Sequence, residues 1–506
     1  MAAALPLVCI IGAGSSGMAA CKNFKERGIP FECFDAADRI GGMWAFKNNI
    51  AYNGKSSAYR SLHINTSRRQ MAYLDFPMPE DYPDFPSHAQ VAEYFESYVD
   101  HFGLRPHIQL GTTVTHCQRL ADGNWEVRLN DEETRRYDAL VVANGHHWDP
   151  QWPEPAFPGH FDGLQMHAHY YVDPTEPHDL RDKNVLVIGM GNSAIDITAE
   201  LSRKENARKV SLAVRTGTYI LPKYLVNKLP MDAMLRHPSE PPGWMEHLMW
   251  ALPDWVQDKV FAPITTWALN LMVGSPEKYG LPQPKGWFGQ QHPTISSEIH
   301  IRLGSGDITP KPTISELQGD KVKFVDGSVE PVDAIIYCTG YRIGFPFLDK
   351  VLIDAKDNDI ALYQRIADPR YANLLFLGLV QPFCAMMPIA DEQSKWMAAY
   401  LRGEYHLPSA DEMQQSMINE HENTKRRFVS SRRHTIQINC QKYTYHLLKD
   451  LKQGKARAAA AGYSLPVPAQ VGRAPQMAGG KSIAEPSASR SSSELSTQDQ
   501  PAEATG

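Results

Sequence analysis

The stretch that decides the fold is Leu7-Val-Cys-Ile-Ile-Gly12-Ala-Gly14-Ser-Ser-Gly17, close to the N-terminus. Its first five residues are apolar and end at a glycine, which is typical of a buried parallel strand followed by a tight turn. The residues from Ser15 to Arg27 predict a helix that stops at Gly28, and Phe31-Glu-Cys-Phe34 predicts a second strand. Together these elements predict a βαβ unit that binds a dinucleotide.

Each glycine of this first motif has its own role. Gly12 permits the tight turn, Gly14 lets a pyrophosphate approach the backbone, and Gly17 lets helix and strand pack closely. The free N–H groups at the helix N-terminus then face the phosphates. Asp35 ends the second strand, and its carboxylate can accept both ribose hydroxyls. Glycines alone would be a weak signal, but strand, helix and acid in register make it specific.

A second motif of the same kind, Gly189-Met-Gly191-Asn-Ser-Ala194, lies between the predicted strand 184–188 and the predicted helix 193–203. The next predicted strand, 210–214, is followed by Arg215 and not by an acid. An acid would repel a 2′-phosphate, whereas an arginine pairs with it, so we expect this site to prefer NADPH over NADH. The alternative is a surface arginine that only caps the strand.

Two nucleotide sites in one chain imply hydride transfer between the nucleotides, and the acid-bearing site fits FAD. We therefore expect an α/β fold with two Rossmann-like dinucleotide-binding domains. The FAD-binding domain is expected over 1–178 and 326–454, and the NADPH-binding domain is expected as an insert over 179–325. The tail 455–506 is rich in Ala, Ser, Pro and Gly and is expected to be disordered.

Local patterns predict further elements along the chain. The segment 53–90 is expected to be irregular, and 225–300 to hold short helices among many tryptophans and prolines. The tryptophans are interpreted as core packing, with a lid over a substrate channel as the alternative. Other predicted elements are a helix at 89–103, an amphipathic helix at 391–401, and strands at 125–129, 139–143, 334–338 and 374–377.

Composition limits the class of protein. The net charge of -6 argues against a nucleic-acid partner, and no apolar run is long enough to span a bilayer. The first eight residues lack a basic region and a cleavage site, so we do not expect a signal peptide. The seven cysteines are scattered without a CxxC spacing, which favours reduced, mostly buried thiols in a cytoplasmic protein. A disulfide reductase needs a CxxC beside its flavin, so dioxygen is left as the expected electron acceptor.

At this point the chain resembles a known family. Phe161-Asp-Gly163-Leu-Gln-Met-His167-Ala-His-Tyr-Tyr171 fits the pattern F-x-G-x-x-x-H-x-x-x-Y/F that identifies flavin-containing monooxygenases, and it lies between the two glycine motifs. The resemblance covers roughly residues 5–450. It continues in Ile40-Gly-Gly-Met-Trp44, Ser61-Leu-His-Ile-Asn65-Thr-Ser, Asp75-Phe-Pro77, Cys338-Thr-Gly340-Tyr341, Gly378-Leu-Val-Gln381-Pro and Glu392-x-x-x-Trp396.

The resemblance implies a soluble class B flavoprotein monooxygenase. In this family NADPH reduces FAD, NADP stays bound, and the flavin C4a-hydroperoxide oxygenates an amine nitrogen or a sulfide sulfur. The family also places the Asn65 amide near the flavin as a catalytic group; the alternative is an asparagine that stabilises a turn. No metal site is expected. The expected cofactor-binding residues are Gly12, Ala13, Gly14, Ser15, Ser16, Gly17, Asp35, Gly42, Met43, Trp44, Asn65, Thr66, Gly189, Gly191, Asn192, Ser193, Ala194 and Arg215.

Two differences from related enzymes narrow down which members of the family the chain resembles. Related Baeyer–Villiger enzymes carry Trp followed by Pro or Asp where this chain has Tyr171-Val172, which disfavours ketone oxygenation. Microsomal members end in a hydrophobic anchor, whereas this chain ends in a polar tail, which favours the soluble members. His167 is interpreted as a brace between domains, with a general base as the alternative.

The sequence alone leaves other functional classes open. They are a Baeyer–Villiger-type or N-hydroxylating monooxygenase, and a flavoprotein binding or sensor module without turnover. The expected partners are a small amine or sulfide substrate and O2. A homodimer and a weak contact with a membrane surface are left open.

Overall fold

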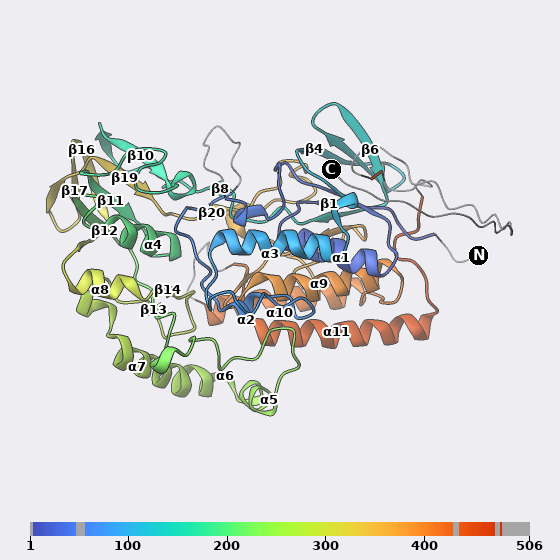
Figure 1. Cartoon of the computed structure of the whole chain (residues 1–506). Coiled ribbons are helices and arrows are strands. Elements are labelled where there is room, and N and C mark those ends of the chain that lie inside the picture. The colour runs from blue at the N-terminus through green and yellow to red at the C-terminus, as the bar shows by residue number, and fades with distance from the viewer. Residues whose placement is uncertain (1–3, 47–55, 429–434, 471–475, 478–506) are drawn as a thin grey trace, which may run out of the picture.

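The computed structural model describes residues 4–46, 56–428, 435–470 and 476–477. Two lobes lie side by side, and each contains a five-stranded parallel sheet (Figure 1). Parts of the sequence-based expectations lie outside the described residues: the first three residues, 53–55 of the irregular segment, and 471–475 and 478–506 of the expected disordered tail.

The first lobe contains the first glycine motif. Its strands run in the order β21-β7-β1-β2-β3, with parallel neighbours throughout. The predicted βαβ unit is confirmed, because α1 follows β1 and leads to β2, which pairs with β1. The strands are β1 (Val8–Ile11), β2 (Phe31–Phe34), β3 (Ile108–Gln109), β7 (Ala139–Val142) and β21 (Leu374–Phe376).

The second lobe contains the second glycine motif. Its parallel sheet has the order β10-β19-β11-β12-β15. Two of its strands, β10 and β19, come from outside the insert 179–325, so this sheet extends beyond the expected boundary on both sides. The strands are β10 (Leu164–His167), β11 (Asn184–Ile188), β12 (Lys209–Ala213), β15 (Ile308–Lys311) and β19 (Ala334–Tyr337).

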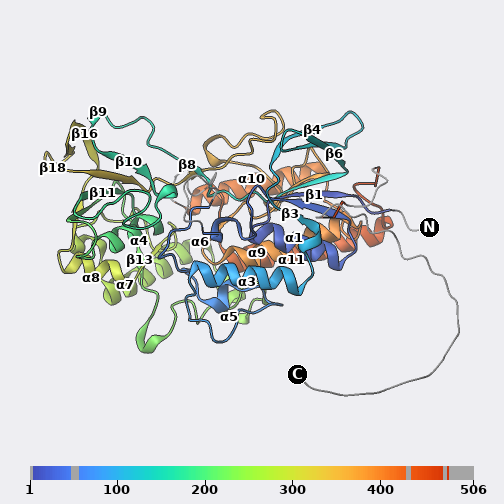
Figure 2. The ribbon, with the colours of Figure 1, turned by 45° about the horizontal axis from the view of Figure 1, so that its top comes forward.

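Smaller sheets complete each lobe. An antiparallel sheet of β4 (Val114–Arg119), β5 (Trp125–Leu129) and β6 (Glu133–Tyr137) belongs to the first lobe. The sheet β18-β17-β16-β9 lies at the edge of the second lobe away from the first (Figure 2). Its strands are β9 (Gly159–Phe161), β16 (Ile314–Gly319), β17 (Lys321–Phe324) and β18 (Val329–Pro331). The two-stranded pairs are β8 (Asp149–Pro150) with β20 (Tyr341–Arg342), β13 (Ile220–Leu221) with β14 (Thr294–Ile295), and β22 (Gln381–Pro382) with β23 (Gln437–Ile438).

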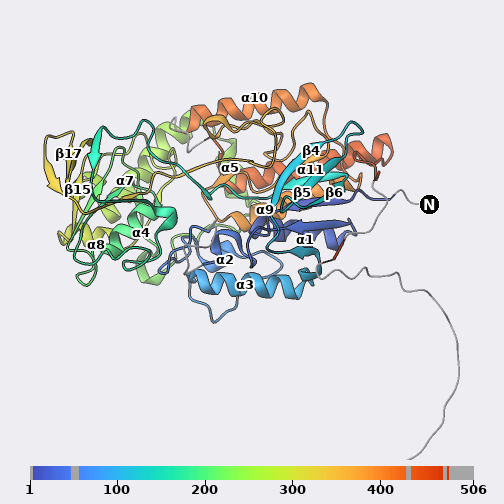
Figure 3. The same ribbon diagram turned by 90° about the horizontal axis from the view of Figure 1, so that it is seen from above.

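Helices surround these sheets. In the first lobe, α3 and α10 lie on opposite sides, with α1 and α9 between them (Figure 3). The first lobe has α1 (Ser15–Glu26), α2 (Arg68–Met71), α3 (His88–His101), α9 (Met386–Leu401), α10 (Ala410–Arg427) and α11 (Cys440–Ala461). The second lobe and the segment after it have α4 (Asn192–Leu201), α5 (Trp244–Ala251), α6 (Asp254–Val256), a π-helical turn (Gln257–Phe261), α7 (Ala262–Val273) and α8 (Glu298–Gly304).

Helix α9 differs from the amphipathic helix expected at 391–401. It begins five residues earlier, at Met386, and nearly all of its residues are buried. The expectation was wrong because the charged residues Asp391, Glu392 and Lys395, which an amphipathic helix would turn to solvent, do not form a solvent face. Instead, Lys395 donates to Asp391 at 2.7 Å and to Glu392 at 2.8 Å inside the lobe.

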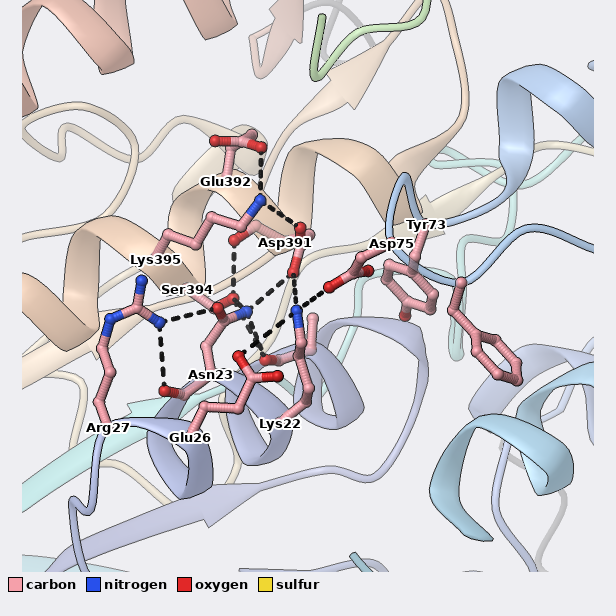
Figure 4. A network of polar contacts seen from close by, with 12 residues as sticks. Lys22, Asn23, Glu26, Arg27, Tyr73, Asp75, Asp391, Glu392, Ser394 and Lys395 are labelled. Carbon is pink, nitrogen blue, oxygen red and sulfur yellow. Dashed lines mark hydrogen bonds and ion pairs between the residues drawn. The ribbon is translucent and has the colours of Figure 1, made fainter. Parts of the chain in front are cut away.

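A polar network joins α9 to α1 (Figure 4). Lys22 on α1 is only 3% exposed and forms ion pairs with Asp75 and, at 3.9 Å, with Asp391. Asn23 donates to Asp391 and to Ser394, both at 2.8 Å. Buried charges are tolerated only when they are paired and hydrogen-bonded, as they are here. The network therefore fixes the helix that carries the first glycine motif against a helix from the far end of the chain.

The tail boundary expected at Lys455 is also wrong. Helix α11 continues to Ala461, because alanine is the best helix former and this run is alanine-rich. Its last turns are packed: Ala458 is fully buried, and Arg457 donates to the carbonyl of His406 at 2.9 Å. Val467, beyond the helix, is buried as well.

One pair of cysteines departs from the expected reduced thiols. Cys384 and Cys440 form a disulfide, with a Cα–Cα distance of 6.2 Å. They are 56 residues apart, and the pairing of β22 with β23 brings their segments together. Cysteines this far apart in the sequence do not form a CxxC motif, so that pattern does not reveal the pair. Among the described cysteines, the free thiols are Cys9, Cys21, Cys33, Cys117 and Cys338.

The tryptophan-rich segment is not core. Trp244, Trp255 and Trp267 are 75%, 60% and 66% exposed, and Trp287 is exposed too. These residues lie on or near α5–α7, along the lower edge of the molecule (Figure 1). The interpretation as core packing is therefore wrong, because these helices have too few neighbours to cover their apolar faces. In the described parts of the chain, no helix combines the length and apolarity needed to cross a bilayer.

Candidate functional site

A cavity of about 960 Å³ is lined by residues from both glycine motifs. The carboxyl ends of parallel strands in open α/β sheets are where ligands of this fold class bind, and both motifs follow such strand ends. The cavity therefore brings the two predicted nucleotide sites together. The expected residues that line it are Gly12, Gly14, Ser15, Ser16, Asp35, Gly42, Met43, Trp44, Asn65, Thr66, Gly191, Asn192, Ser193 and Ala194.

The three glycines of the first motif are needed for different reasons. Gly12 has φ +107°, and a Cβ there would lie 2.5 Å from the Ala143 carbonyl oxygen. A Cβ on Gly17 would lie 1.8 Å from the Gly12 carbonyl oxygen. Gly14 is different: its φ is -75°, and a Cβ would meet only Gly42, at an ordinary 3.6 Å. The protein's own packing does not require a glycine at position 14, so this position fits the close approach of a ligand.

Two helices begin at the cavity. Helix α1 follows Gly14 and helix α4 follows Gly191, and neither start has a side-chain cap within the described chain. The first N–H groups of an α-helix have no partner inside the helix and carry partial positive charge. Two uncapped helix starts that face one cavity are suited to hold the phosphates of two dinucleotides.

Asp35 stands at the end of β2 and lines the cavity, as predicted. Its carboxylate accepts the Ala13 N–H at 2.7 Å and the Ala37 N–H at 2.8 Å. These bonds explain why Ala13 does not face the cavity: its N–H holds the acid against the glycine turn. A carboxylate offers about four acceptor positions, so Asp35 keeps capacity for ribose hydroxyls.

Asn65 lines the cavity in the loop before α2. Its Oδ1 is shielded from solvent and has no hydrogen-bond partner in the described structure. An unsatisfied buried polar atom costs about 1–3 kcal/mol, so an atom of this kind that faces a cavity is suited to a partner bound there. Together with the space at Gly14, this orphaned oxygen shows that the residues present fit a bound flavin dinucleotide.

The second motif has a similar frame. Gly189 has φ +131°, and a Cβ would lie 2.6 Å from the Cys338 carbonyl oxygen. Asn192 accepts the Ile295 N–H at 2.9 Å, which anchors the start of α4. Arg215 follows β12, is exposed, and lies outside the cavity lining.

Two histidines in the cavity wall are held neutral. Burial, together with the neighbouring His169, lowers the pKa of His167 to about 4. Its Nδ1 accepts the His169 N–H at 3.1 Å, which supports the interpretation of His167 as a brace. Burial, together with His147, lowers the pKa of His146 well below its usual value. The imidazoles of His146 and His167 therefore carry no charge at neutral pH.

Contacts between the lobes surround the cavity. The Tyr59 hydroxyl donates to Asp196 on α4 at 2.7 Å, and the burial of Asp196 raises the pKa of its carboxyl. On the same helix, Glu200 accepts the Tyr171 hydroxyl at 2.8 Å. These bonds tie helix α4 to the segments that connect the lobes.

Sequence reasoning missed several segments of the lining, among them 112–115. Three others are 143–148, 338–341 and 380–387, none of which was assigned to the site. Two of the three overlap motifs that carry the resemblance, Cys338-Thr-Gly340-Tyr341 and Gly378-Leu-Val-Gln381-Pro. The signal was present, but only the folded chain shows that these motifs face the same cavity.

Comparison with known proteins agrees with this geometry. The chain matches the model of the flavin-binding monooxygenase-like family over residues 6–455. Flavin-containing monooxygenase 5 of Rattus norvegicus is 34% identical over 443 residues, which cover 85% of this chain and 80% of that protein. The N-oxide-forming dimethylaniline monooxygenase 2 of Macaca mulatta is 32% identical over 459 residues, which cover 88% and 82%.

Solved structures show the same fold. The S-allyl-L-cysteine S-oxygenase from Allium sativum superposes with a TM-score of 0.64 at 24% identity, over 92% of this chain and 90% of that chain. An oxidized steroid monooxygenase bound to NADP gives 0.66 at 18% identity, over 91% and 98%. With the family match and the relatives above, the chain belongs to the flavin-binding monooxygenase-like family and is an NADPH-dependent monooxygenase that uses FAD.

Proposed function

We propose that this monooxygenase oxygenates soft nucleophiles, either the nitrogen of a tertiary amine or the sulfur of a sulfide. The observation that carries the proposal is the cavity lined by both nucleotide motifs and by Asn65, in whose wall burial lowers the pKa of His146 and of His167. A soft nucleophile needs no base to attack an electrophilic oxygen, so such a cavity suits it. The N-oxide-forming relative from Macaca mulatta supports the same substrate class.

The residues have distinct proposed roles. FAD lies along Gly12–Gly17, with its ribose at Asp35, and NADPH lies along Gly189–Ala194, with its 2′-phosphate at Arg215. When bound, FAD takes a hydride from NADPH and supplies the oxygen-transfer chemistry. The surrounding chain excludes water and orients both nucleotides. The NADPH domain is proposed to run from the start of β9 to the end of β19, since its sheets use strands from that whole range.

Oxygen uptake tests the substrate class. We expect NADPH-dependent oxygen consumption that tertiary amines or sulfides stimulate, with N-oxides or S-oxides as products in equal amounts. Lactones or esters from ketones would indicate a Baeyer–Villiger enzyme, and hydroxylamines an N-hydroxylating one. A flavin that NADPH bleaches once, without catalytic oxygen uptake, would indicate a binding or sensor module.

We propose that the Asn65 amide supports oxygen transfer beside the flavin. Asn65→Ala is expected to keep its FAD and its reduction by NADPH, because Asn65 lies outside both glycine motifs. Losing one hydrogen bond of about 1–2 kcal/mol should raise the ratio of hydrogen peroxide to oxygenated product by five- to thirtyfold. A peroxide assay run beside product analysis measures that ratio.

Asn419→Ala is the matched control, since Asn419 is exposed on α10. It should leave the ratio of peroxide to product as in the parent. If Asn65→Ala also leaves it unchanged, Asn65 is a turn residue without a catalytic role.

We also propose that α5 and α7 rest on a lipid surface. Helix α7 contains no charged residue, and its Trp267 and Leu271 are 66% and 71% exposed. Tryptophan is favoured where apolar and polar phases meet, and an uncharged apolar helix face binds such an interface without a span. A protein partner would be expected to meet more polar groups at the rim.

Flotation with phosphatidylcholine vesicles tests this contact. The parent should float with the vesicles, and replacing Trp244, Trp267 and Leu271 by serine should weaken binding at least about tenfold, because each side chain loses apolar burial. Equal flotation of parent and variant would contradict the proposal. The control replaces three exposed valines on other surfaces: Val325, Val329 and Val351.

A cytoplasmic location stays a prediction of the sequence, to be tested by cell fractionation. Light scattering tests whether the chain forms a homodimer.

A further inference from the structure

A segment between strands β12 and β15 of the second sheet lies against the loop that carries Asn65. We name residues 223–237 the clamp segment and residues 61–72 the Asn65 loop. The clamp segment follows β13 and precedes the exposed helix α5. It therefore connects the NADPH side of the molecule to a loop of the FAD side. Its contacts fall on both sides of Asn65.

The first contact is made at Ile64, the residue before Asn65. The Lys223 ammonium donates to the Ile64 carbonyl oxygen at 3.0 Å and lies 5.2 Å from the centre of the Phe85 ring. Burial lowers the pKa of Lys223, while the nearby Asp196 carboxylate opposes that change. A cation in such a partly buried place is held by its acceptor and by the ring below it.

The second contact is made at Ser67, two residues after Asn65. Asp232 accepts the Ser67 N–H at 2.6 Å, at the start of α2. The buried Gln70 then donates to the carbonyl oxygens of Leu235 at 2.6 Å and of Asp232 at 3.3 Å. The bond to the Asp232 carboxylate is charge-assisted, and it also stabilises the helix start.

The geometry at Ile64 links these contacts to the Asn65 side chain. The Ile64 N–H donates to the Pro86 carbonyl oxygen of its own lobe at 3.0 Å, while its carbonyl accepts from Lys223. The Ile64 carbonyl and the Asn65 N–H belong to the same rigid peptide plane. Lys223 therefore sets the orientation of the plane from which Asn65 extends.

We propose that Lys223 and Asp232 are positioning residues through which the NADPH side of the molecule holds the Asn65 amide in place. The proposal rests on the role proposed above for Asn65. Without the clamp, FAD still binds, but the amide is no longer fixed. A larger share of turnover then gives NADP⁺ and hydrogen peroxide from NADPH, O2 and a proton from solvent, without oxygenated product.

Lys223→Met tests the proposal, because methionine keeps most of the apolar stem and removes the donor. Lys228→Met is the matched control, since Lys228 is exposed in the same segment. In the substrate-free holoenzyme, hydrogen exchange of the peptide 62–72 should become about five- to tenfold faster in Lys223→Met only. The ratio of peroxide to product should rise by a similar factor, and Lys223→Arg should restore both values.

The same measurements on Asp232→Ala give an independent second variant. An unchanged rate of hydrogen exchange in both variants would overturn the proposal. So would faster exchange with an unchanged ratio of peroxide to product, if Asn65→Ala itself raises that ratio. Loss of flavin from both variants would also overturn it, because the segment would then support FAD binding itself. If Asn65→Ala stays coupled, the proposed role of Asn65 fails, and the exchange rates alone decide whether the clamp holds the loop.

Discussion

Gly14→Val is expected to yield colourless protein, with FAD affinity lowered by about ten- to a hundredfold or more, since an overpacked contact costs about 1–3 kcal/mol. The valine methyl groups would occupy the space that the pyrophosphate needs. The protein itself should tolerate them, because the φ of -75° is ordinary and a Cβ meets only Gly42, at 3.6 Å. Flavin absorbance per chain, measured beside thermal unfolding of the apoprotein, separates loss of cofactor from loss of fold.

A substitution at position 14 tests FAD binding, whereas substitutions at the other two glycines of the motif do not. A valine at Gly12 or Gly17 would collide with backbone oxygen atoms at 2.5 Å and 1.8 Å and would report on folding alone. Gly304→Val is a suitable control: it lies at the end of α8, and a Cβ there has open space around it. A yellow, fully loaded Gly14→Val protein would contradict the proposed position of FAD.

Arg215→Ala is expected to raise the Michaelis constant for NADPH by about ten- to a hundredfold, because a charge-assisted hydrogen bond contributes about 1.5–3 kcal/mol. NADH lacks the 2′-phosphate, so its Michaelis constant should hardly change. The arginine is exposed and lies two residues after the end of β12, where its guanidinium can pair with a phosphate in two bonds. Initial rates with both nucleotides, at saturating substrate and oxygen, measure the difference.

Arg208→Ala provides the control. Arg208 is also exposed, but it precedes β12, at the opposite end of the same strand. Its loss should affect neither nucleotide. Equal changes for NADPH and NADH in Arg215→Ala would show that Arg215 only stabilises the strand end.

The sequence predicts the sheets and glycine turns well because their signals are local. The strands at 31–34, 125–129 and 184–188 have the bounds expected from apolar runs and from alternation. The Gly12 and Gly189 turns follow from a backbone conformation that only glycine adopts easily. A parallel strand that is buried on both faces needs little knowledge of the rest of the chain.

Long-range partners limit prediction elsewhere. An amphipathic helix would turn the charges of α9 to solvent, but Asp391 is paired with Lys395 and Lys22 inside the lobe, and Asn23 of α1 donates a hydrogen bond to it. The tryptophans of α5–α7 suggested core, yet no larger element covers them in the described structure. Hydrophobicity alone does not say whether a partner surface exists.

The candidate site shows the same limit. The two glycine motifs and Asn65 were identifiable because each has a fixed local pattern. Lys223 could not be identified, because a single lysine in a loop has no signature. Its contact with Ile64 spans 159 positions of the chain. Only the folded chain shows which backbone group a flexible side chain meets.

The order of strands in the first sheet has a consequence for synthesis on the ribosome. Strand β21, which pairs with β7, and helix α9, which packs on α1, follow the entire second lobe in the chain. The second lobe is nearly contiguous and can fold while the later residues are still being made. Until β21 and α9 emerge, the nascent chain exposes an unpaired edge on β7 and the uncovered charges of Lys22. Such edges favour pairing with other chains, so slow translation beyond β19 would prolong the period in which a nascent chain is prone to aggregate.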